Sequence, residues 1–131
     1  MKKLFVILLA LFAISGFSTV VRADGIDFKS YLALKADSST KDLLELYVGG
    51  MGSGIQIANI AHSDKGRKKL YCVPSELAVT SPQYVSILDR FLLRNEEKIS
   101  KLVKEDPTIL DKNILPVFLL QGLIDTFPCD K

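Results

Sequence analysis

Two cysteines constrain the fold of this chain more than any other feature of its sequence. Cys72 lies in a Tyr-Cys-Val-Pro stretch (71–74), and Cys129 ends a Phe-Pro-Cys stretch (127–129). Two cysteines permit one intramolecular pairing, and the chain-entropy model gives such a disulfide about 4 kcal/mol of stabilisation at most. That would be a large share of the stability of a small domain. The alternative is an intermolecular bridge through Cys129.

The first 23 residues have the features of a secretory signal peptide. Lys2 and Lys3 precede an apolar run over residues 4–21, and the small residues Val21 and Ala23 fit the −3 and −1 positions of a signal-peptidase site. We therefore expect cleavage after Ala23 and a location in the bacterial periplasm, an oxidising space that suits a disulfide. An uncleaved membrane anchor is the alternative, because the apolar run approaches the roughly 20 residues that span a bilayer.

Residues 24–131 are expected to form a single domain, because their 108 residues supply one hydrophobic core. Of the 17 basic residues in the chain, Lys2, Lys3 and Arg22 belong to the signal, which leaves 14 basic against 15 acidic residues and a net charge of −1. The net positive charge of the whole sequence therefore comes from the predicted signal peptide. The charge of residues 24–131 gives no support for nucleic acid as a partner.

Apolar residues recur at helical spacing through nearly all of the predicted domain, and no convincing alternating strand appears. The pattern predicts a short first helix capped by Asp27, a second helix over about 41–61 and a third over about 81–104. A last helix begins or is kinked at Pro116 and ends before Pro128. The expected fold is therefore a small all-α bundle of four to five helices, braced by one disulfide.

A loop over residues 62–80 is expected to carry Cys72 between the second and third helices. The start of the third helix has two readings. Ser81-Pro82 would open it with proline at the first helical position. A capping box between Thr80 and Gln83 would begin it one residue earlier.

The second predicted helix contains an unusually dense run of glycines over residues 49–54. Each costs a helix about 1 kcal/mol relative to alanine, so a compensating contact is expected. Gly50, Gly54 and Ala58 recur every four residues and would form a small-residue groove, to which a second backbone from this subunit or from another would pack closely. A phosphate-binding loop is rejected, because no Gly-Lys-Ser/Thr follows and no strand precedes the run.

Residues suited to catalysis or metal binding are scarce. Ser53 lacks the flanking glycines of a nucleophile elbow, because Met51 and Ile55 occupy those positions. The single histidine, His62, has no free cysteine to join it in a zinc site of the usual nitrogen and sulfur kind. We therefore expect neither an enzyme nor a cofactor or metal site.

Two charged segments remain as candidates for contact with a partner. The first carries Lys65, Arg67, Lys68 and Lys69 and leads into Cys72, and the second covers residues 94–106. A solubilising surface is the alternative for both. Loops held on a fixed frame are where binding residues tend to lie, and the first segment adjoins the expected disulfide. We therefore favour the first segment.

Four stretches, in this order, give the chain a resemblance to a known family. They are Tyr-Val-Gly-Gly (47–50) with Gly54, Tyr-Cys-Val-Pro (71–74), a helix from Gln83 to Leu92, and the terminal Phe-Pro-Cys (127–129). In these stretches the chain resembles the periplasmic immunity proteins that protect bacteria from type VI secretion amidase effectors, the resistance-associated protein family. The resemblance covers about residues 43–129, most of the predicted domain.

The resemblance implies a small helical protein, commonly dimeric, that has no catalytic activity of its own. Such a protein inhibits a secreted peptidoglycan amidase by occupying its catalytic cleft. On this chain Lys65, Arg67, Lys68 and Lys69 are the candidate contacts, because positive charge would steer the protein towards an acidic cleft. The family motif does not itself mark them. A periplasmic stress chaperone or an envelope-associated binding protein is the alternative function.

Overall fold

Five α-helices and two short 3-10 helices, joined by loops, lie within residues 25–129, the part of the chain that the computed structural model describes. In chain order they are α2 (Phe28–Ala36), η1 (Ser38–Thr40), α3 (Lys41–Asp64), α4 (Ser81–Arg94), α5 (Glu96–Glu105), η2 (Pro107–Asp111) and α6 (Leu115–Thr126). Over these residues there is no strand, so the expected all-α fold is confirmed. The predicted signal peptide, residues 1–23, lies outside the described range.

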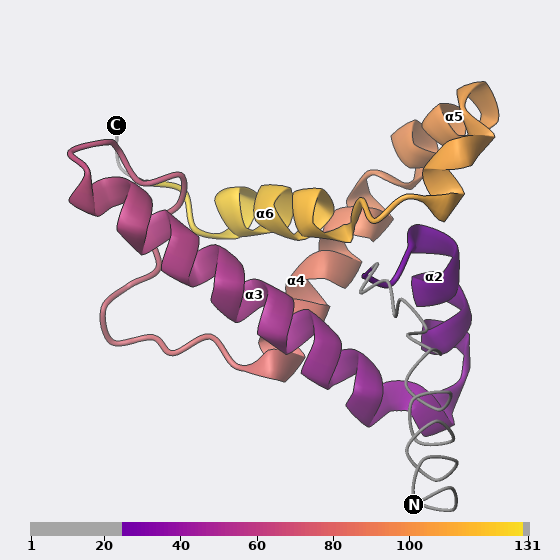
Figure 1. Ribbon diagram of the computed structural model, residues 1–131, viewed down its shortest axis with the longest axis horizontal. Coiled ribbons are helices and arrows are strands. Elements are labelled where there is room, and N and C mark those ends of the chain that lie inside the picture. The colour runs from indigo at the N-terminus through magenta and orange to yellow at the C-terminus, as the bar shows by residue number, and fades with distance from the viewer. Residues whose placement is uncertain (1–24, 130–131) are drawn as a thin grey trace, which may run out of the picture.

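The longest helix, α3, is the one against which α2, α4 and α6 pack (Figure 1). α4 and α6 lie against one side of it, and α2 packs near the end where α3 begins, while α5 lies farther away and contacts η2 and α4. The described chain ends beside the other end of α3, next to the loop that follows that helix (Figure 1). The two ends of α3 therefore have different neighbours.

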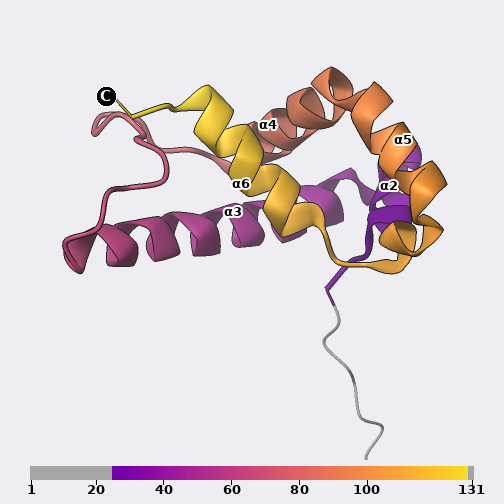
Figure 2. The same ribbon diagram turned by 90° about the horizontal axis from the view of Figure 1, so that it is seen from above.

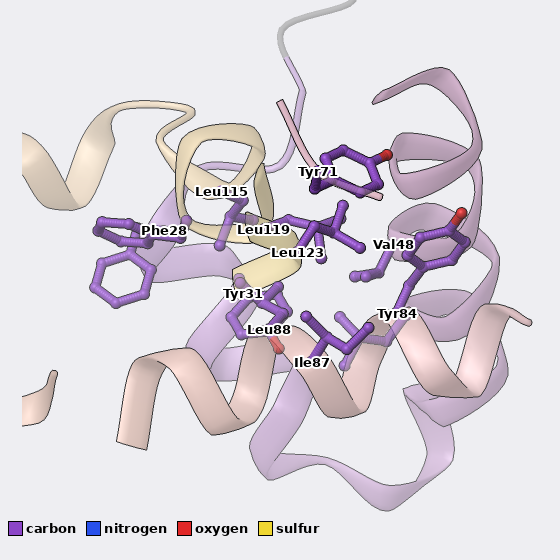
Figure 3. Packing of buried hydrophobic residues seen from close by; sticks show 12 residues of the cluster. Phe28, Tyr31, Val48, Tyr71, Tyr84, Ile87, Leu88, Leu115, Leu119 and Leu123 are labelled. Atoms are coloured by element: carbon purple, nitrogen blue, oxygen red, sulfur yellow. The ribbon is translucent and has the colours of Figure 1, made fainter. Parts of the chain in front are cut away.

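The core is contributed by α2, α3, α4 and α6, together with one tyrosine from the loop before α4 (Figure 3). Burying each large apolar side chain stabilises the fold by roughly 1.5–3 kcal/mol relative to leaving it exposed. Phe28 and Phe118 pack edge to face, with ring centroids 5.6 Å apart. The side chains with essentially no exposure are Tyr31, Val48, Tyr71, Leu88, Leu115, Leu119 and Leu123.

The ends of the helices follow the local signals in the sequence. Asp27 Oδ1 accepts a hydrogen bond from the Ser30 N–H at 2.6 Å and caps α2, as predicted. α4 begins with the predicted capping box, in which Thr80 is the N-cap and its N–H donates to Gln83 Oε1 at 2.7 Å. α3 ends three residues later than predicted, so His62 lies in its last turn and not in a loop.

The prediction of one continuous helix over 81–104 is wrong, because the chain changes direction at Asn95. Asn95 Nδ2 donates to the Phe91 carbonyl oxygen at 2.9 Å, and the Asn95 N–H donates to the same oxygen at 3.1 Å. Asparagine side chains compete with the backbone for such carbonyls, which disfavours helix continuation. The break places α5 beside η2 and away from α6 (Figure 1).

The glycines that allow close packing within the subunit are Gly49 and Gly52, not Gly50 and Gly54. A methyl group at Gly49 would overlap Ser81 of α4, and one at Gly52 would overlap the Tyr84 ring. Around Gly50 and Gly54, apart from their chain neighbours and the nearby backbone of α3 itself, no described atom lies within 4 Å of where such a methyl would sit. Ala58 is likewise exposed. The intramolecular form of the Gly50, Gly54 and Ala58 prediction is therefore wrong.

Candidate partner-binding site around the cystine

The two cysteines meet in a single intramolecular disulfide. Cys72 and Cys129 have Cα atoms 4.9 Å apart and an S–S bond of 2.01 Å. A backbone hydrogen bond from the Cys72 N–H to the Phe127 carbonyl oxygen, 2.8 Å long, joins the same two segments. The alternative of an intermolecular bridge through Cys129 is therefore wrong. The Tyr-Cys-Val-Pro and Phe-Pro-Cys stretches lie side by side.

Asn59 fixes the segment before Cys72 to α3. Its Nδ2 donates to the Tyr71 carbonyl oxygen at 2.8 Å, and its Oδ1 accepts from the Leu70 N–H at 2.8 Å. Asn59 is 3% exposed, and it is the one buried polar side chain among the described residues. Because both ends of its amide are bonded, the cost of burying it is offset.

Asn59 was not among the predicted functional residues, although its position in the sequence carries a signal. Asn59 follows Ile55 by four residues on α3, on the side of the helix that faces the core. A polar residue in the apolar stripe of a helix needs a partner, and loop backbone is a frequent one. The same segment contains Tyr71, whose side chain is fully buried. Burial, with a smaller contribution from Tyr84, raises the pKa of Tyr71 to about 12.

The basic loop, residues 65–69, begins where α3 ends and finishes at the Asn59 contact. Gly66 adopts a left-handed conformation, with φ of 74°, and its N–H donates to the Ser63 carbonyl oxygen at 2.9 Å. A left-handed glycine is a common way for a helix to end. The loop is therefore held by a helix terminus on one side and by Asn59 and the disulfide on the other.

The four basic side chains predicted as contacts are all exposed in this loop. None of them forms an ion pair with an acidic side chain among residues 25–129. Their charges are therefore available to a partner, on a backbone held at both ends. The residues are Lys65, Arg67, Lys68 and Lys69.

The second charged segment, residues 94–106, differs from the basic loop because its charges are mixed. It forms α5, in which Lys101 pairs with Glu105 at 3.9 Å. Just beyond that helix, Asp106 pairs with Lys112 at 3.2 Å. These are exposed pairs of small energetic value, but they leave less unbalanced charge of one sign than the basic loop has. The basic loop therefore remains, of the two segments, the predicted contact surface.

Ser53 and His62 lie on α3 and are not brought together with other reactive groups. Ser53 Oγ donates to the Gly49 carbonyl oxygen at 2.9 Å, within the helix. Among residues 25–129, no group of three or more His, Cys, Asp or Glu side chains is placed to hold a metal ion. No helix in this range has both the length and the apolar character that crossing a bilayer requires.

Comparison of the chain with protein-family models, with curated proteins and with solved structures finds no match in any of the three. A function is therefore proposed from two observations. One is the set of contacts that hold the basic loop and the cystine, and the other is the resemblance of the four sequence stretches to the immunity-protein family.

Proposed function

We propose that this chain is a periplasmic immunity protein that binds a type VI secretion peptidoglycan amidase and inhibits it by occluding the active site. One observation carries the proposal. The two cysteine-containing stretches behind the resemblance are joined at the cystine, beside an exposed loop of unpaired basic side chains. In this proposal the protein has no catalytic step and no cofactor, and the signal peptide delivers it to the periplasm.

Preorganisation of the loop supports tight binding by this surface. Association costs free energy when flexible loops must be ordered, and a loop already held in place avoids part of that cost. Here α3, the Asn59 amide and the disulfide hold the ends of the basic loop. Binding energy would then go into contacts with the amidase and not into ordering the inhibitor.

The charge of the loop supports fast and selective association. Unpaired positive charges steer a protein towards a negatively charged partner and raise the association rate, most strongly at low salt. The proposal therefore expects acidic residues around the catalytic cleft of the amidase. An immunity protein benefits from a high association rate, because it must reach the toxin before the cell wall is cut.

The test begins with recovery of the partner. The oxidised protein, purified from the periplasm, is used to capture hydrolases from effectors secreted by competing strains. We expect to recover a peptidoglycan amidase, and we expect its activity to be abolished at a stoichiometric ratio. Failure to retain any hydrolase across several effector sets would refute the proposal.

Charge reversal then tests the contact surface. Changing Arg67, Lys68 and Lys69 to Glu should lower the association rate with the amidase about tenfold or more, and the loss should shrink at high salt. Reversing three basic residues of α5 is the matched control, because it alters net charge equally. That variant carries Lys98→Glu, Lys101→Glu and Lys104→Glu. Equal losses in both variants would remove the basic loop from the interface.

A second candidate, a periplasmic stress chaperone, is favoured by the amount of exposed apolar surface. Leu46, Ile57 and Leu93 are 74%, 68% and 73% exposed. Surfaces of this kind bind partly unfolded proteins. Protection of a model substrate from aggregation, appearing only at low pH and without any amidase binding, would favour the chaperone over the immunity protein.

A further inference from the structure

α5 is an amphipathic helix whose apolar side the rest of the protein does not bury. Ile99, Leu102 and Val103 recur at helical spacing, and yet no residue of α5 is buried. After the chain breaks at Asn95, α5 packs mainly against η2 and only slightly against α4. In Figure 2, α2 and α5 lie at one end of the molecule and the loop that follows α3 lies at the other.

An open groove with a volume of about 630 Å³ lies beside α5 and is lined by α2, α4, α5 and η2. We call it the α5 groove. Its apolar wall includes Phe28 and Leu32 of α2, Leu92 and Leu93 of α4, and Ile99 and Val103 of α5. Leu32 and Leu93 are 44% and 73% exposed, so no described residue covers much of this wall. The volume lies within the range of small-ligand sites, about 300–1,000 Å³, which are mostly apolar with a few polar groups.

Polar side chains from one side of α5 also line the α5 groove. Glu96, Ser100 and Lys104 follow one another at intervals of four residues, and all three line the groove. Lys104 forms no ion pair among residues 25–129. The other lysine of the groove, Lys35, is paired with Asp89. Within the described part of the chain, Lys104 is therefore the cation of this groove whose charge is free to bind a ligand.

Size and charge identify the class of ligand. Glu96 and Lys104 are about 12 Å apart along the helix axis, and a partner helix of that length would occupy roughly 900–1,400 Å³, more than the groove holds. A single hydrocarbon chain is much thinner, and it gains free energy with each methylene group that leaves water. An anionic group at one end of the chain would be attracted to Lys104 and repelled by Glu96, which gives the chain one direction in the groove.

We propose that the α5 groove binds a long-chain fatty acid, whose carboxylate is held by Lys104 and whose hydrocarbon chain runs along the apolar wall towards the helix break at Asn95. The hydroxyl of Ser100, one turn before Lys104, is a second donor for the carboxylate. This ligand accounts both for the uncovered apolar wall and for the unpaired lysine. The site lies at the opposite end of α3 from the basic loop, so it does not depend on the proposed inhibition of an amidase.

Calorimetric titration with laurate, a saturated fatty acid, tests the site. The oxidised protein is purified from the periplasm and freed of bound lipid beforehand. We expect one laurate per chain, bound with a dissociation constant in the micromolar range. Decanoate, which is shorter by two methylene groups, should bind about ten- to twentyfold more weakly, because each buried methylene group changes the affinity about fourfold.

Charge reversal tests the contact with the carboxylate. Lys104→Glu should raise the dissociation constant of laurate about five- to tenfold, because attraction is replaced by repulsion. It should leave that of dodecanol, the uncharged alcohol of equal chain length, nearly unchanged. Lys98→Glu is the matched control: Lys98 is also exposed on α5 and also forms no ion pair among residues 25–129, but it does not line the groove. That variant should bind both ligands as the native protein does.

Substitution on α5 tests the apolar wall. Val103→Glu places a carboxylate against the hydrocarbon chain and should raise the dissociation constants of laurate and dodecanol about tenfold or more. Leu102→Glu is the matched control, since Leu102 is the preceding residue of the same helix, is 40% exposed and does not line the groove. Urea unfolding of both variants checks that they retain the fold.

Other outcomes decide the proposal as a whole. Absence of saturable laurate binding up to about 100 μM overturns it, since that is well above a micromolar dissociation constant. Equal weakening by Lys104→Glu and Lys98→Glu, or by Val103→Glu and Leu102→Glu, also overturns it. A protein that inhibits an amidase and binds no laurate would refute the fatty-acid site and leave the proposed function standing. A protein that binds laurate and retains no hydrolase would do the reverse.

Discussion

The Tyr31 hydroxyl donates a hydrogen bond to Asp89 Oδ1 across 2.9 Å, and so joins α2 to α4 over 58 residues of sequence. The same carboxylate oxygen accepts from Lys35 Nζ at 2.5 Å. Tyr31 is fully buried, so this bond satisfies the hydroxyl where water cannot reach it. One partly exposed carboxylate thereby fixes the first helix of the described chain on the core.

Asp89→Ala should destabilise the protein by about 1–3 kcal/mol, because the buried Tyr31 hydroxyl would lose its acceptor. Urea unfolding gives the free energy. Asp125→Ala on α6 is the control, since that exposed carboxylate has only a long contact of 3.5 Å with Gln121. Asp89→Asn retains an acceptor and should recover much of the loss; an Asp89→Ala protein as stable as the native one would contradict the assignment.

Asn59→Ala should destabilise the protein by about 2–4 kcal/mol, because it removes two hydrogen bonds and leaves backbone groups of the 70–71 segment without partners. The effect should also be local. Amide exchange of Leu70 should accelerate strongly, since its N–H donates to Asn59 Oδ1. Ser63→Ala, which removes an exposed side-chain hydrogen bond on the same helix, is expected to change stability little. Unchanged exchange at Leu70 would show that Asn59 does not hold this segment.

Gly52→Ala and Gly54→Ala should change stability in opposite directions. A methyl group at Gly52 would overlap the Tyr84 ring, and overpacking of this kind costs about 1–3 kcal/mol. The same group at Gly54 meets no described atom within 4 Å, apart from its chain neighbours and the nearby backbone of α3 itself, and should stabilise the helix by up to about 1 kcal/mol.

Both substitutions are best compared by urea unfolding of the oxidised protein at the same low protein concentration. If both substitutions shifted stability in the same direction, the face of α3 that contacts α4 would have to be reassigned.

The protein should lose stability above pH 10. Burial raises the pKa of Tyr71 to about 12, burial and the neighbouring Asp89 charge raise that of Tyr31 further, and burial also raises that of Tyr84. A tyrosine whose pKa is higher in the folded state contributes its full stabilisation below the unfolded pKa of about 10, and loses it as the pH rises through the folded value.

Unfolding at pH 8 and pH 11 measures this loss, which should be about 1 kcal/mol for each fully buried tyrosine at pH 11. Titration of tyrosinate absorbance should show the buried tyrosines ionising only as the chain unfolds. Tyr31→Phe should reduce the pH dependence. Tyrosines that all titrated near pH 10 without unfolding would contradict the burial of Tyr31 and Tyr71.

Local signals in the sequence were sufficient to predict much of the fold. Asp27 acts within a single helical turn, and so its position marked the start of a helix. Thr80 and Gln83 also act within one turn, but they gave only one of two possible starts for α4, and the structure decided between them. Because the chain has no other cysteine, Cys129 was the one possible intramolecular partner of Cys72, and the structure decided against an intermolecular bridge. In each case the residues that decide the structure are close in sequence or unique in type.

Features that depend on distant parts of the chain were not predicted. Spacing alone could not show that Gly49 and Gly52 face α4, since that depends on how α3 is rotated against its neighbours. The acceptor of the Tyr31 hydroxyl lies 58 residues away in the sequence, so no local pattern could identify it.

The helix break at Asn95 could have been predicted from the sequence, because a side-chain amide that competes for a backbone carbonyl is a local effect.

The disulfide also divides the chain in a mechanical sense. Cys72 and Cys129 close a covalent ring that contains α4, α5, η2 and α6, while α2 and α3 lie outside it. A pulling force applied at the two ends can straighten only the segment before Cys72. The ring transmits the load through its sulfur atoms and cannot lengthen. Under tension α2 and α3 therefore bear the strain, and the polypeptide from α4 to α6 stays closed until the S–S bond is broken.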